Sequence, residues 1–205
     1  MGVFSDEISE RYRKYIIQLK LPAQQSLYLL WGTDTANEDT DYLMLDQEYK
    51  MLAFPNISEL LHYVKTTGNS LIDEPATKEW LSNYKANRAY TSYDLVQLMN
   101  LMESDQGHQD YTKDEAWEIT AFCSLFSDYA YQLDREDLLR LYQDKDLHVF
   151  IDWVNAQYLW KPDVAYLAEL TQQLEHSGFE KIKVTIRKIY HSFIQNLVIV
   201  SNTDH

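Results

Sequence analysis

The histidines and the cysteine are the side chains best suited to catalysis or metal binding, so their spacing is examined first. The six histidines are His62, His108, His148, His176, His191 and His205. No two of them form an HxxxH pair, which would place two imidazoles on one face of a helix. His62 ends a single ExxH sequence, whereas a carboxylate-bridged di-iron site needs two. We therefore expect no metal centre, and His62 is predicted to be an exposed helix residue.

Nucleotide and nucleophile motifs are missing as well. The five glycines are separated by at least 30 positions, whereas phosphate-binding loops need clustered glycines to let backbone N–H groups approach the anion. No GxSxG sequence is present. Cys123 falls on the apolar face of a predicted helix, with no histidine or base nearby to lower its pKa, and is expected in the core. The sequence thus predicts no cofactor and no enzyme.

One acidic loop, residues 34–41, could suggest calcium. An EF-hand loop counted from Asp34 would need glycine at its sixth position and glutamate at its twelfth. Those positions hold Asp39 and Leu45. We therefore interpret residues 34–41 as a hydrated hairpin connection.

Hydrophobic periodicity predicts the elements that carry these residues. Strands are expected at 26–32, 41–46 and 50–54, and helices at 7–19, from Asn56 or Ser58 to Gly68, from Pro75, at 95–102, 114–133, 138–142, 147–160 and 163–176. Residues 91–94 resemble a capping box ahead of the helix at 95. Residues 181–187 alternate as a strand would, although Ile186, Ile189 and Phe193 also fit a helix. We favour a strand there, followed by another at 197–200.

These elements predict an α+β fold with a small N-terminal antiparallel sheet, a mainly helical remainder and a C-terminal strand pair. No stretch rich in proline, glycine or serine interrupts the chain, so we expect one domain over residues 1–205. Its sheet part is predicted at about 1–70, its helical part at about 75–176, and its C-terminal strands at about 179–200.

Net charge is the most informative property of the composition. The chain has 32 acidic and 18 basic residues, a formal charge of −14, and residues 101–175 alone carry −11. Such a surface repels nucleic acid and anionic lipid and attracts basic partners. A single cysteine, no signal peptide and no long apolar run indicate a cytoplasmic protein that binds neither membrane nor nucleic acid directly.

The acidic segment also has many aromatic residues, among them Trp117, Trp153 and Tyr158, the last two of which are expected in the core. Carboxylates are favoured in the first turns of helices, which accounts for part of the acidic excess but not for the scarcity of basic residues. The residues proposed to contact a basic partner are Asp105, Asp110, Asp134, Glu136, Asp137, Asp144 and Asp146.

The sequences at 28–32, 41–46 and 54–60 are similar in style to the strand–strand–helix modules of immunity proteins from bacterial toxin–immunity systems, including contact-dependent growth inhibition. This resemblance implies an inhibitor that occludes the active site of a cognate toxin domain, often a basic nuclease. Two alternatives remain open. The chain could be a DNA mimic or regulatory binding protein, or an enzyme whose site is assembled from scattered residues.

Overall fold

The chain divides into two compact units, which we describe separately. The structure is a computed structural model that describes residues 3–35, 39–67, 74–85, 87–159 and 163–200. Unit 1 contains Met1–Leu95 and Asn196–His205, and unit 2 contains Val96–Gln195. The single domain expected from the sequence stays a prediction, while the α+β class is confirmed by nine helices and two sheets in the described part of the chain.

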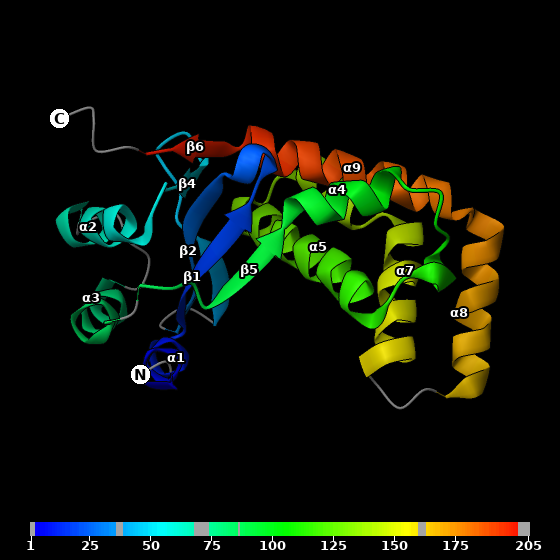
Figure 1. Cartoon of the computed structure of the whole chain (residues 1–205), viewed down its shortest axis with the longest axis horizontal. Coiled ribbons are helices and arrows are strands. Elements are labelled where there is room, and N and C mark those ends of the chain that lie inside the picture. Colours follow the sequence, from blue (N-terminus) through cyan, green and yellow to red (C-terminus); the bar gives the residue numbers. More distant parts are fainter. Residues whose placement is uncertain (1–2, 36–38, 68–73, 86, 160–162, 201–205) are drawn as a thin grey trace. The chain divides into compact units, whose positions relative to one another are not determined.

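Unit 1 is built on a four-stranded sheet of order β3-β2-β1-β5 and a two-stranded sheet of β4 and β6 (Figure 1). Its strands are β1 (Lys14–Lys20), β2 (Ser26–Asp34), β3 (Thr40–Leu43), β4 (Met51–Ala53), β5 (Thr91–Asp94) and β6 (Leu197–Ile199). Its helices are α1 (Val3–Tyr12), η1 (Pro22–Gln24), α2 (Ile57–Thr67) and α3 (Glu74–Asn83). Strands β2 and β3 are antiparallel neighbours, as expected, and β1 pairs antiparallel with the other side of β2.

The prediction of a helix over residues 7–19 is wrong in its second half. Helix α1 ends at Tyr12, Arg13 adopts a positive φ of 50°, and the chain continues as β1. Strand β1 is central and almost wholly buried, so its apolar residues form a continuous run that also fits a helical stripe. The β-branched pair Ile16-Ile17 suits the strand.

The capping box expected at 91–94 is also wrong. These residues form β5, which pairs in parallel with β1 from Ile17 opposite Thr91 to Lys20 opposite Asp94. The sheet is therefore mixed. Helix α4 (Leu95–Glu103) follows β5 without an intervening loop, so polar residues that resembled a cap are used by an edge strand instead.

One apolar cluster holds unit 1 together. It contains Ile16 and Leu30 from the sheet, Leu60 from α2, and Trp80, which is fully buried, from α3. The Asn56 side chain accepts a hydrogen bond from the Glu59 backbone N–H at 2.9 Å and so caps α2, as predicted. Gly68, the expected end of this helix, lies outside the described residues.

Unit 2 is helical throughout its described part. After α4 come η2 (His108–Asp110), α5 (Lys113–Leu133), α6 (Glu136–Tyr142), α7 (Lys145–Val154), the π-helical turn η3 (Asn155–Leu159), α8 (Val164–Ser177) and α9 (Phe179–Gln195). Helix α5 confirms the prediction for 114–133, and a reciprocal cap between Thr112 and Glu115 starts it. The helix expected to reach residue 160 changes to a π turn after Val154, and Trp160 lies outside the described residues.

The strand favoured at 181–187 is wrong. Residues 179–195 form one helix, α9, in which Ile182, Ile186, Ile189 and Phe193 are fully buried at a spacing of four, three and four. Gly178, with a φ of 77°, ends α8 and allows the chain to turn into α9. The strand expected at 197–200 is confirmed as β6, but it pairs in parallel with β4 rather than forming a C-terminal strand pair.

Candidate functional site

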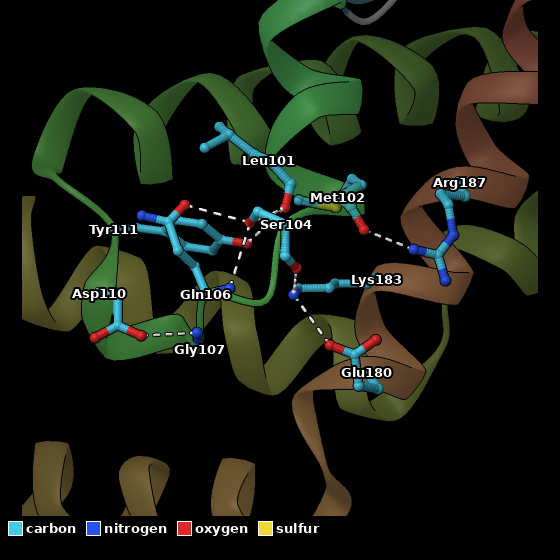
Figure 2. A network of polar contacts seen from close by, with 10 residues as sticks. All are labelled: Leu101, Met102, Ser104, Gln106, Gly107, Asp110, Tyr111, Glu180, Lys183 and Arg187. Carbon is cyan, nitrogen blue, oxygen red and sulfur yellow. Dashed lines mark hydrogen bonds and ion pairs between the residues drawn. The ribbon is translucent and has the colours of Figure 1, made fainter.

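Polar side chains in unit 2 converge on the C-terminal end of α4 (Figure 2). The last carbonyls of a helix have no partner within it and carry partial negative charge. Here the Leu101 carbonyl accepts hydrogen bonds from the Ser104 hydroxyl at 2.8 Å and the Tyr111 hydroxyl at 3.3 Å. Burial raises the pKa of Tyr111, so its phenol remains a donor at neutral pH.

Lys183 of α9 is the main cation of this network. Its side chain is fully buried, and its Nζ donates to the Ser104 carbonyl at 2.5 Å and pairs with Glu180 at 3.0 Å. The ammonium also lies 5.5 Å from the centre of the Phe179 ring, within cation–π range. A buried lysine can be a nucleophile, but this one is already held by two oxygens and an aromatic ring. The geometry therefore supports a structural role.

Arg187, one turn further along α9, donates to the Met102 carbonyl at 2.6 Å (Figure 2). Two of the four cations of α9 thus bind backbone oxygens at the end of α4 and directly after it, while Lys181 and Lys188 are exposed. Sequence reasoning missed both contacts, since it placed residues 181–187 in a strand. The helical spacing of the isoleucines was the available signal, but nothing in the sequence indicates that Lys183 is buried.

The seven acids proposed to contact a partner have different surroundings. Glu136 pairs with Arg140, and Asp137 pairs with Arg135, which lowers the pKa of the Asp137 carboxyl. All four of these side chains are largely exposed, so the pairs add little stability.

Three more of the seven acids stabilise local backbone or a neighbouring helix. Asp144 caps α7 by accepting from the Leu147 N–H at 3.0 Å. Asp110 accepts from the Gly107 N–H at 2.8 Å, and Asp146 accepts from a serine hydroxyl of α8 at 2.6 Å. Their positions are explained by structure alone.

Asp105 and Asp134 remain. Both are exposed, and neither side chain has a hydrogen bond or ion pair with a described residue. Asp134 has a φ of 49° at the end of α5, a conformation that aspartate tolerates better than most residues. These two carboxylates are the members of the set most open to a partner, and the contiguity of the seven stays a prediction.

Two large aromatic side chains of α5 are exposed. Trp117 and Tyr131, on α5, have exposed fractions of 52 % and 56 %. At 100° per residue, their separation of fourteen positions places them on nearly the same face of the helix. Tyr131 lies edge-on to Tyr142 of α6, which in turn contacts His148 of α7. An aromatic row therefore crosses the junction of these three helices.

His108 lies in a second aromatic group, between Trp153 at 5.0 Å and Phe179 at 5.7 Å between ring centres. It is 7 % exposed, and its Nε2 has no hydrogen-bond partner within the described residues. Burial lowers the pKa of His108, against smaller opposing effects from Glu175 and Asp110. Trp153 is buried as expected, whereas Tyr158 is only half-buried.

Cys123 and His62 lie in the surroundings that the sequence predicts for them. Cys123 is fully buried, and burial raises the pKa of its thiol to about 12, so it is not a reactive thiolate at neutral pH. His62 is exposed on α2. In the described part of the chain, no group of three or more histidine, cysteine, aspartate or glutamate side chains is placed to hold a metal ion. Across the same residues, no helix has the length and apolar composition needed to cross a bilayer.

Comparison with known proteins gives a likeness of fold alone. No family model matches the chain, and no curated protein does. A solved structure that resembles it is the C-terminal domain of SatS in complex with bromine, with a TM-score of 0.56. The alignment covers 94 % of this chain and 96 % of that one at 11 % sequence identity. At that identity the likeness supports the architecture and gives no argument about activity.

Proposed function

We propose that this chain is a protein-binding inhibitor whose acidic helical unit takes a basic protein partner. The observation that carries the proposal is the inward orientation of Lys183 and Arg187. Residues 96–178 have sixteen acids and five bases, a net charge of −11, and α9 is the only part of unit 2 rich in bases. Two of its four cations are held by carbonyls at the end of α4 and directly after it, so they are not free to pair with the acids of residues 96–178.

The exposed aromatic residues can supply binding affinity that charge alone does not provide. Electrostatic attraction steers a partner and sets specificity, but buried tyrosine and tryptophan side chains contribute most of the affinity in many interfaces. Trp117 and Tyr131 share a face of α5, and Asp134 follows directly at its end. We infer that the partner contacts this face with basic residues around an apolar centre.

The most specific form of the proposal is neutralisation of a toxin domain by occlusion of its active site. That form rests on the sequence resemblance at 28–60 and on the charge. A basic nuclease fits it, since an enzyme that binds phosphates carries the complementary potential.

The experiment begins with affinity capture of partners from the organism that encodes the chain, followed by affinity measurements on the recovered partner. We expect a basic protein whose binding weakens steeply as salt rises. Trp117→Ala with Tyr131→Ala should weaken binding by about 30-fold or more, the effect of losing a central aromatic anchor. Asp105→Asn with Asp134→Asn should weaken it less and reduce the salt dependence.

A matched control is Glu7→Gln with Glu79→Gln, two exposed carboxylates of unit 1. This pair changes the net charge by the same amount and should leave binding unchanged. An acidic or neutral partner would contradict the proposal. So would equal losses from the control pair and the unit 2 pair, or affinity that survives removal of both aromatic residues.

A further inference from the structure

A groove between α2 and α3 of unit 1 has the composition of a ligand site. It has a volume of about 590 Å³ and is lined by Leu61, His62, Val64, Lys65, Lys78, Leu81 and Ser82. Pockets of 300–1,000 Å³ commonly hold small organic molecules. The two helices lie beside one another (Figure 1).

The floor of the groove is apolar. Val64 is buried in the core of unit 1, while Leu61 and Leu81 are half-buried and pack against that core from the two facing helices. The aliphatic stems of the two lysines can extend this surface toward the rim. The groove could therefore hold an unbranched apolar chain.

The rim is basic, unlike most of the protein. Lys65, Lys78 and His62 are all exposed, and no carboxylate is among the described residues that line the groove. Lys78 pairs with Glu74 one turn away, whereas Lys65 has no ion pair with any described residue. An ammonium beside an apolar floor favours a ligand with one negative charge and an apolar tail.

We propose that the α2–α3 groove binds an amphipathic anion, a carboxylate with an unbranched aliphatic tail, with its head between Lys65 and Lys78 and its tail against Leu61, Val64 and Leu81. This site is separate from the partner surface of unit 2 and does not depend on the function proposed for it. The net charge of −14 disfavours binding of any anion, because the molecule as a whole repels anions and attracts cations. Preference for an anion over a cation in the groove must therefore come from the local charge of its rim.

Decanoate, below its micelle-forming concentration, is the probe, and backbone amide chemical shifts of the whole chain report where it binds. We expect saturable shifts confined to α2 and α3. Acetate has the charge without the tail, and decyltrimethylammonium has the tail with the opposite charge. Both should bind the groove at least about tenfold more weakly than decanoate. Equal or stronger binding of the cation, or decanoate shifts spread over the surface, would overturn the proposal.

Three variants test the site itself. Lys65→Glu with Lys78→Glu should weaken decanoate binding by about tenfold or more, since both changes are at exposed positions and reverse the local charge. Ser82→Phe should weaken decanoate binding by narrowing the groove without changing its charge. Lys85→Glu, a charge reversal of one exposed lysine outside the groove, is the control and should leave the affinity within about twofold. The proposal fails if the double variant binds like the Lys85→Glu control, or if Ser82→Phe binds decanoate as tightly as the wild type, with native amide spectra in each case.

Discussion

Replacing Lys183 by methionine tests whether the buried cation stabilises unit 2. Methionine keeps the length and most of the volume of lysine and removes the charge. The change leaves the Ser104 carbonyl without its 2.5 Å donor and separates Glu180 from its partner. The rest of the network at the end of α4 is not altered directly, because Arg187 and Tyr111 bind other carbonyls.

The expected loss follows from the burial of each group. A hydrogen bond from a charged donor contributes about 1.5–3 kcal/mol. The Glu180 side chain is 76 % exposed, so its ion pair adds at most about 0.5 kcal/mol after solvent screening. Methionine recovers about 1 kcal/mol, since an apolar side chain in that place carries no desolvation penalty. We therefore expect Lys183→Met to lower the free energy of unfolding by about 0.5–2.5 kcal/mol.

Urea denaturation followed by far-ultraviolet circular dichroism measures this loss. With a slope of about 2 kcal/mol per molar urea, the midpoint should fall by roughly 0.3–1.3 M. Lys188→Met, an exposed lysine of the same helix, should move the free energy by less than about 0.5 kcal/mol. Glu180→Gln should resemble that control. A Lys183→Met protein as stable as the wild type would refute the structural role of the ammonium.

Two further predictions concern acid stability and helix capping. Burial lowers the pKa of His108 below its unfolded value of about 6.5, so the stability it contributes is complete above that pH and is lost as the pH falls toward the lowered value. His108→Phe should therefore weaken the loss of stability between about pH 7.5 and pH 5, whereas the exposed His62→Phe should not; identical pH profiles for the two variants would contradict this. Asp144→Ala removes the cap of α7 and should cost about 1 kcal/mol in urea denaturation, against less than about 0.5 kcal/mol for the exposed Asp105→Ala; equal losses would mean that the cap is not stabilising.

The elements predicted correctly are those whose buried residues recur at one regular spacing along the chain. Helix α5 shows one broad apolar face, and its limits follow from Thr112 and the residues after Leu133. Strand β1 and helix α9 were predicted wrongly for opposite reasons. A central strand buried on both faces has no alternation to detect, while the lysines of α9 alternate with its isoleucines over a short stretch by chance.

The sequence predicts the net charge around the candidate site, but it does not predict how the individual side chains are placed. Composition located the acidic excess in the helical unit, but the individual acids could not be separated into capping residues and free ones. That distinction depends on backbone N–H groups near Asp144 and on a helix-to-helix contact of Asp146 with Ser177, thirty-one positions away. The long-range bond between Lys183 and the Ser104 carbonyl was similarly out of reach.

Local roles explain where many acids lie, but they do not require acids. Serine, asparagine and aspartate cap helices about equally well, yet both α7 and α8 begin with aspartate, at Asp144 and Asp163. A neutral cap would serve the fold as well and would lessen the repulsion among neighbouring carboxylates. Charged residues at positions where a neutral residue would do raise the negative potential of unit 2 beyond what its stability needs. This excess supports the proposal that unit 2 attracts a basic partner.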